Sequence, residues 1–150
     1  MLKNIDPLLS PELLFVLAAM GHGDEIAVTD ANFPAASVAK QTGHGRVVPV
    51  PGANMPQTVA AILSVLPLDQ FVEAPVRTME ADGGPGNMPP VQREAQAAVD
   101  NAAGKHLPVL AVERFAFYEA ARHCYAVVLT GEPRFYGNVI IKKGAVPPGQ

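Results

Sequence analysis

The sequence predicts an α/β protein with three layers, in which helices cover both faces of a mainly parallel or mixed sheet. Segments with helical signals alternate along the chain with short, nearly continuous apolar segments, and strands of that kind are typically buried on both faces. With 150 residues, 49% of them hydrophobic, the chain is long enough to form one domain, which we expect to span residues 1–150.

The first helix and the first strand carry clear local signals. Residues 10–12, Ser-Pro-Glu, favour a helix start: the serine can accept free amide hydrogens, proline fits the first turn, and the acid faces the positive end of the helix dipole. We expect Gly21 to end this helix in the left-handed conformation. The β-branched segment 25–29 then predicts a strand, which leaves Asp30 at its carboxyl end.

Prolines and glycines divide the rest of the chain. Pro49 lies within a possible strand over 46–50 and indicates an edge position, because proline has no N–H to donate to a neighbouring strand. Glycines and prolines make the segment 81–90 a surface loop, and Gly104 is expected to cap the helix before it. The other expected elements are helices over 56–66, 90–103 and 115–123 and strands over 76–79, 108–112, 125–129 and 138–141.

Charge and composition exclude several classes of protein. The formal net charge is -3 and no cluster of lysines and arginines occurs, so a nucleic-acid partner is not expected. The one cysteine, Cys124, cannot form an internal disulfide, which is compatible with a reducing compartment. No apolar stretch approaches the roughly 18 residues of a membrane span. We therefore expect a cytoplasmic protein that does not contact a membrane.

Two histidines lie in Gly-His-Gly triplets, at positions 22 and 44. Asp30 lies eight residues after His22, with one strand between them, and a carboxylate can hold a histidine in one tautomer for acid–base chemistry. The alternative is a turn histidine that bonds to the backbone. No carboxylate lies within ten residues of His44, which we expect to be structural or exposed to solvent. No HxH or HExxH pattern suggests a metal site.

Two further segments offer groups that could bind a polar ligand. Arg114 follows an expected strand, so its guanidinium would emerge at a carboxyl edge, where ligands of α/β proteins gather. The turn Tyr136-Gly137-Asn138 could present a phenol and an amide to a polyhydroxylated ligand. The alternatives are a surface salt bridge for Arg114 and an ordinary turn before the last strand.

Four segments in chain order, MGHGDEI, TDANFPA, ERFAFYE and YGNVIIKKG, resemble the L-fucose mutarotase and D-ribose pyranase family. The opening LKNIDPLLSPELL, the arginine before FAFYE and the Y-G-N turn are similar to the fucose branch. The resemblance runs from residue 1 to about residue 144.

This resemblance implies a ring-forming α/β domain, assembled as a homodecamer, that acts as an isomerase. Its expected reaction interconverts the α and β anomers of a free monosaccharide, with L-fucose as the expected substrate, without cofactor or metal. The resemblance implies that His22 is the catalytic acid–base residue and that the sugar site is lined by Asp30, Arg114, Tyr136, Gly137 and Asn138.

Other functions stay open at this point. A D-ribose pyranase-type enzyme would interconvert pyranose and furanose forms, whereas a sugar-binding or sensor protein would bind a monosaccharide without accelerating exchange. In a purely structural ring the two polar turns would be interface turns, and no sugar would bind. A metal-dependent sugar isomerase would lose its activity in a chelator.

Overall fold

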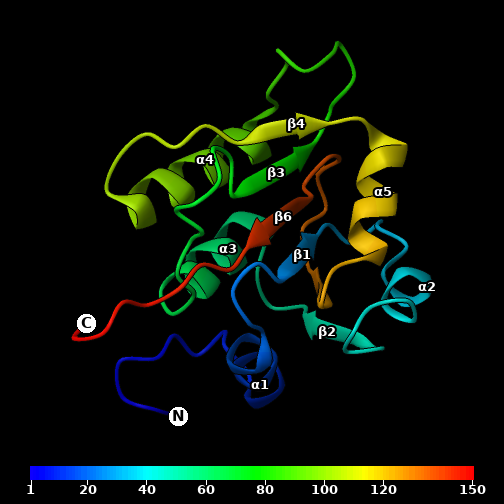
Figure 1. Ribbon diagram of the computed structural model, residues 1–150. Helices are drawn as coiled ribbons and strands as arrows, with labels where there is room; N and C mark the ends of the chain where they lie inside the picture. Colours follow the sequence, from blue (N-terminus) through cyan, green and yellow to red (C-terminus); the bar gives the residue numbers. More distant parts are fainter.

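The protein is described over residues 1–150 by a computed structural model, which contains five helices and six strands (Figure 1). In chain order these are α1 (Pro11–Ala19), β1 (Glu25–Thr29), α2 (Ala35–Ala39), β2 (Val47–Val50), α3 (Met55–Leu63), β3 (Val76–Met79), α4 (Pro90–Ala103), β4 (Leu110–Val112), α5 (Arg114–Arg122), β5 (Ala126–Thr130) and β6 (Val139–Lys142).

The strands form one mixed sheet in the order β2-β5-β1-β6-β3-β4. Strands β2, β5 and β1 run parallel, β3 and β4 run parallel, and β6 is antiparallel to both β1 and β3. The carboxyl ends of β1 to β5 and the amino end of β6 therefore lie at one edge of the sheet, called the carboxyl edge below. Asp30, after β1, and Asn138, before β6, meet at this edge.

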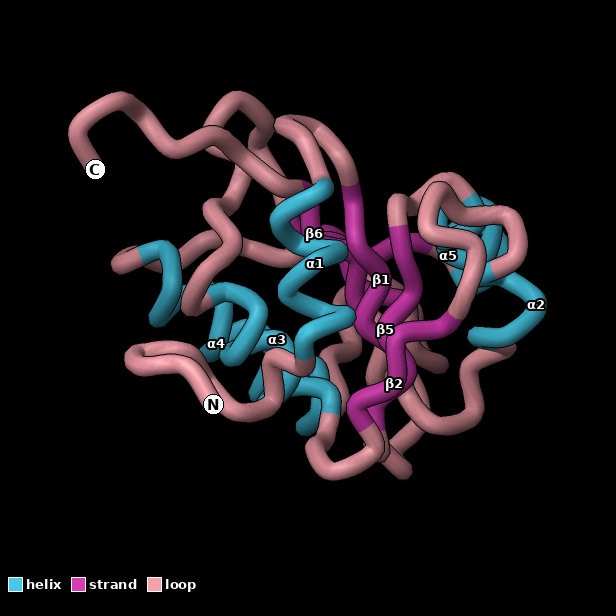
Figure 2. The backbone as a smooth tube through the Cα atoms, turned by 90° about the horizontal axis from the view of Figure 1, so that it is seen from below, coloured by secondary structure: helices cyan, strands magenta, loops and turns pink.

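Helices cover both faces of the sheet, which confirms the three-layer prediction (Figure 2). Helices α1, α3 and α4 lie on one face, over a large apolar cluster that includes Leu13, Met55 and Val99. Helices α2 and α5 lie on the other face, over a smaller cluster that includes Val38 and Phe117. Because both faces are covered, β1 and β5 are buried almost throughout, as their nearly continuous apolar sequences predict.

The start of α1 agrees with the sequence, but its end does not. Ser10 Oγ accepts a hydrogen bond from the amide of Leu13 at 3.2 Å, as a helix cap should. The left-handed glycine, however, is Gly23 rather than Gly21. The amide of Gly21 donates instead to the Asp24 carboxylate at 2.7 Å. The ammonium of Lys143 donates to carbonyl oxygens of the last turn of α1, so no glycine cap is needed.

Most other elements lie within a few residues of their predicted positions. Strand β2, which contains Pro49, is an edge strand of the sheet, as predicted. Gly104 caps α4 with a φ of 68°. The sequence reading missed α2, because five residues are too few to show a helical period. None of the helices is long and apolar enough to cross a membrane.

Candidate functional site

A pocket of about 320 Å³ opens at the carboxyl edge of the sheet. Asp30, Arg114, Tyr136 and Asn138, four of the six residues predicted for a ligand site, line this pocket. The others in its wall are Asn32, Phe33, Met79, Tyr118 and Phe135. Polar groups from three separate segments thus converge on a wall that also carries aromatic rings, a combination typical of small-ligand sites.

Asp30 and Asn138 form a reciprocal pair at the base of the pocket. The amide of Asp30 donates to Asn138 Oδ1 at 2.9 Å, and Asn138 Nδ2 donates to Asp30 Oδ2 at 2.9 Å. The other carboxylate oxygen accepts the amide of Asn32 at 3.0 Å. Only 4% of Asp30 and 3% of Asn138 are exposed. Burial raises the pKa of Asp30 above its ordinary value, although its hydrogen bonds oppose that shift.

Tyr136 occupies a strained turn that the fold holds in place. Its φ is 62°, a conformation rare for residues other than glycine, and such strain gathers at functional sites. The buried Gln92, on α4, donates to the carbonyl oxygen of Tyr136 at 3.0 Å and to that of Met79 at 2.6 Å. Interaction with the Asp82 carboxylate raises the pKa of the Tyr136 phenol, and Asp82 belongs to the predicted loop 81–90.

Gly137 is needed for close packing and does not line the pocket. A Cβ atom there would lie 2.8 Å from Cγ of Glu132, closer than real Cβ contacts allow. Gly137, which was predicted to line the site, therefore has a conformational role. Because it lacks a side chain, the segment between β5 and β6 can fold tightly beneath the pocket.

An ion network behind this segment was missed by the sequence reading. Glu132 is fully buried and accepts hydrogen bonds from the amide of Met55 and from the amide and guanidinium of Arg134. Arg134 also makes two hydrogen bonds, of 2.9 and 2.8 Å, to the carboxylate of Glu94 on α4. Burial acts to raise the pKa of Glu132, but the hydrogen bonds of Arg134 and Met55 outweigh it and hold the pKa below its usual value. The available signal in the sequence was an acid two residues after an apolar strand.

Arg114 begins α5 at the rim of the pocket. The Glu113 carboxylate caps this helix by accepting the amides of Phe115 at 3.0 Å and Ala116 at 2.9 Å. The Arg114 guanidinium carbon lies 4.8 Å from the centre of the Phe115 ring, so the contact is a cation–π contact rather than a salt bridge. This exposed guanidinium can donate to ligand oxygens.

His22 does not line the pocket. It precedes β1, at the opposite edge of the sheet, and the chain from Glu25 to Asp30 alone covers about 16 Å. Its Nε2 lies 3.1 Å from Oδ1 of Asp69, and its ring centre lies 5.4 Å from that of Phe71. Within one copy of the chain, therefore, the carboxylate partner of His22 is Asp69, and Asp30 is remote.

The other three histidines pair with surface acids. His44, in the second Gly-His-Gly triplet, is buried and lies 3.1 Å from Glu12, which fits the structural role predicted for it. His106 pairs with Asp100, and His123 with Glu119. Nowhere in the structure do three His, Cys, Asp or Glu side chains gather as metal ligands would.

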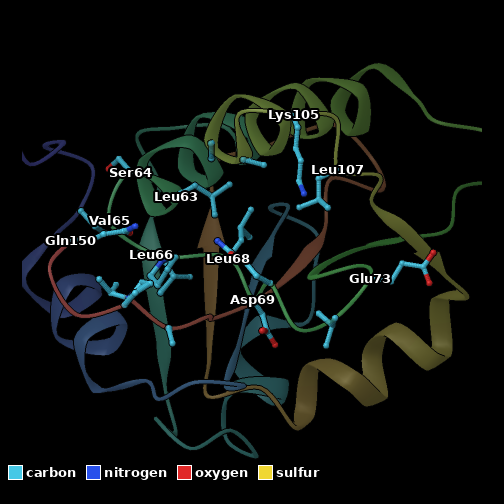
Figure 3. A pocket seen from close by; sticks show the side chains of 18 residues that line it. Leu63, Ser64, Val65, Leu66, Leu68, Asp69, Glu73, Lys105, Leu107 and Gln150 are labelled. Carbon is cyan, nitrogen blue, oxygen red and sulfur yellow. The ribbon is translucent and has the colours of Figure 1, made fainter.

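A larger pocket, of about 860 Å³, lies on the side of the molecule that carries Asp69 (Figure 3). Leucines from α3, from the segment after it and from the segment after α4 form much of its wall, and the last residues of the chain close one side. Nothing in the sequence predicted this pocket, because its wall combines residues 63–73 with residues 102–107 and 145–150.

Comparisons with known proteins agree with the resemblance found in the sequence. Residues 3–146 match the RbsD / FucU transport protein family. The chain is 46% identical to an L-fucose mutarotase of Actinobacillus pleuropneumoniae over 98% of this chain and 99% of that protein, and 44% identical to a fucose mutarotase of Bos taurus over 98% and 95%.

A solved structure is also similar: the fucose mutarotase of Streptococcus pneumoniae in complex with L-fucose, 35% identical, with a TM-score of 0.86 over 97% of this chain and all of that one.

Proposed function

This chain belongs to the RbsD / FucU transport protein family, and from that premise we propose that it is a carbohydrate isomerase that interconverts the α and β anomers of free L-fucose. The observation that carries the proposal is the pocket at the carboxyl edge, where a buried carboxylate, an amide, a phenol and a guanidinium converge. These groups can hydrogen-bond to the several hydroxyls of one monosaccharide.

The proposed reaction needs only proton transfers. A base takes the proton of the anomeric hydroxyl, the bond between the anomeric carbon and the ring oxygen breaks, and an acid protonates that oxygen. The open-chain aldehyde turns and closes on its other face as the two protons return. Asp30, Arg114, Tyr136 and Asn138 hold the hydroxyls, Gly137 shapes the turn, and His22 transfers the proton.

The position of His22 requires a second copy of the chain. Because His22 and Asp30 lie at opposite edges of the sheet, both can act on one sugar only if they come from neighbouring copies. Exposed aromatic rings support this arrangement: Phe71, 81% exposed, lies beside His22, and the exposed Phe115 and Phe135 lie beside the pocket. Contacts between different surfaces of identical chains close into a ring when the rotation from one copy to the next divides a full turn.

We propose that this ring is a homodecamer located in the cytoplasm. The single cysteine supports a reducing compartment, and burial raises the pKa of its thiol to about 12, so Cys124 is unreactive at neutral pH.

Mixing two inactive variants tests the shared site. His22→Ala and Asp30→Asn should each lower exchange strongly, whereas rings reassembled from equal amounts of both should regain activity at about one quarter of their sites. Arg114→Ala, which alters an exposed side chain, serves as a second partner for His22→Ala. Wild-type rings taken apart and reassembled in the same way control for activity lost in the procedure. Light scattering should give a mass near ten times 15.8 kDa for the assembled ring. Mixed rings without activity would contradict the shared site.

A further inference from the structure

Asp69 is held rigidly next to the ring of His22. Leu68 pairs with Lys143 beyond the end of β6, and the amide of Asp69 donates to the carbonyl of Lys142 at 3.2 Å. Oδ1 of Asp69 accepts the amide of Phe71 at 3.0 Å and lies 3.1 Å from Nε2 of His22. Only 5% of the Asp69 side chain is exposed. Its carboxylate is therefore fixed by the backbone on both sides, in contrast to the flexible acids of a surface pair.

The ring of His22 is fixed on one side and open on the other. The amide of Gly23 donates to the carbonyl of Lys143 at 2.8 Å, which ties the Gly-His-Gly turn to the segment after β6. Phe71 packs against the ring, and Asp69 engages Nε2. No hydrogen bond of the structure uses Nδ1, and 46% of the side chain is exposed.

We propose, on the basis of the proposed function, that Asp69 is a positioning residue that keeps the hydrogen of His22 on Nε2, so that Nδ1 is the nitrogen that exchanges a proton with the sugar. An ionised carboxylate can only accept hydrogen bonds, so the nitrogen that faces it carries the hydrogen. Separately, the amide of Phe71 and the contact with His22 hold the pKa of Asp69 below its usual value, which keeps it ionised at neutral pH.

This arrangement accounts for every proton that moves in the reaction. Nδ1 accepts the proton of the anomeric hydroxyl through its free lone pair, while Nε2 keeps its own hydrogen. The resulting imidazolium lies 3.1 Å from a negative charge and then returns the proton from Nδ1. Asp69 itself neither gains nor loses a proton. A carboxylate in this position stabilises one tautomer and the imidazolium, as in the serine protease triad.

Asp69→Ala tests the proposal by removing the acceptor that faces Nε2. Oδ1 contacts both the amide of Phe71 and Nε2, so an asparagine whose oxygen stays on the Phe71 amide would still offer Nε2 an acceptor. In Asp69→Ala no group holds the ring hydrogen on Nε2. We expect kcat to fall by about 10²- to 10⁴-fold, with KM nearly unchanged, because proton transfer is impaired and the pocket around Asp30 is intact. Nitrogen-15 NMR of the ring should show a mixture of Nε2–H and Nδ1–H in place of Nε2–H alone. Glu119→Ala, at the exposed pair with His123, is the matched control and should change neither quantity.

The outcomes separate this proposal from the proposed function. If the wild type accelerates exchange and His22→Ala does not, an unchanged kcat and tautomer in Asp69→Ala would overturn the role of Asp69. A wild-type His22 with its hydrogen on Nδ1 would overturn it as well. If the wild type fails to accelerate exchange with any sugar, the proposed function fails, whatever the tautomer. Loss of the ring assembly in Asp69→Ala would be detected by light scattering, and Asp69→Asn would then replace it. Its side-chain oxygen should keep the hydrogen on Nε2 while kcat falls, because an uncharged amide stabilises the imidazolium less than a carboxylate does, and an unchanged kcat would overturn the role of Asp69.

Discussion

Replacing His22 with alanine should lower the rate of L-fucose anomer exchange by about 10²- to 10⁴-fold, the contribution expected of one positioned acid–base group. The substitution removes the only imidazole at the edge where Phe71 and Asp69 form a partly open site. Sugar affinity should change less than the rate, because the hydroxyl-binding groups lie around Asp30. Saturation-transfer NMR at the anomeric protons measures the rate, and titration calorimetry measures the affinity.

The second Gly-His-Gly triplet provides the control. His44 has the same glycine neighbours, but its ring is buried against Glu12. His44→Gln should therefore leave the exchange rate per folded ring unchanged. Equal losses in the two variants, or no loss in His22→Ala, would mean that the first triplet is a turn and not a catalytic element.

Replacing Glu132 with alanine should destabilise the protein strongly, by about 3–5 kcal/mol. Removal of the carboxylate from this buried ion pair leaves its hydrogen-bond donors, the amide of Met55 and the amide and guanidinium of Arg134, without their acceptor. Glu132 is fully buried, and without it the buried amide of Met55 loses its acceptor and the turn at Tyr136 loses its support. The melting temperature should fall by about 6–20 °C at fixed protein concentration. Differential scanning calorimetry measures this change.

Glu94→Gln is the matched control, because Glu94 binds the same guanidinium from an exposed position. It should shift the melting temperature only slightly. The pKa of Glu132 is lowered in the folded state, so its stabilising effect is full above the ordinary value of 4.5 and is lost as the pH falls through the folded pKa. A melting temperature that is equally low in both variants, or unchanged in Glu132→Ala, would refute the supporting role of the buried carboxylate.

Local signals in the sequence were sufficient to predict the layers and most of the elements. The apolar runs of β1 and β5 are continuous because both faces of these strands are buried, and Pro49 marked an edge strand because it cannot donate. The strand signals placed Asp30 at a carboxyl end, but only the resemblance to the L-fucose mutarotase and D-ribose pyranase family put Asp30 and Asn138 in one site. They meet because β6 runs antiparallel to β1.

Long-range contacts could not be predicted in this way. Eight residues separate His22 from Asp30, but the strand between them carries the two side chains to opposite edges. Asp69 is 47 residues from His22, and it reaches the ring only because residues 68 and 69 pair with the end of β6. The partners of Glu132 likewise come from α3 and from the loop that follows β5, and Arg134 in turn binds Glu94 on α4, a combination that exists only after folding.

Two-dimensional exchange NMR of L-fucose with the wild-type protein tests the central claim most directly, with D-ribose and D-galactose measured in parallel. We predict cross peaks between the α and β anomeric protons of L-fucose that grow faster with protein than without it, with smaller effects on the other sugars. Faster exchange for D-ribose alone, with new furanose signals, would instead indicate a pyranase. Line broadening without faster exchange of any sugar would mean that the protein binds a monosaccharide and does not interconvert its anomers.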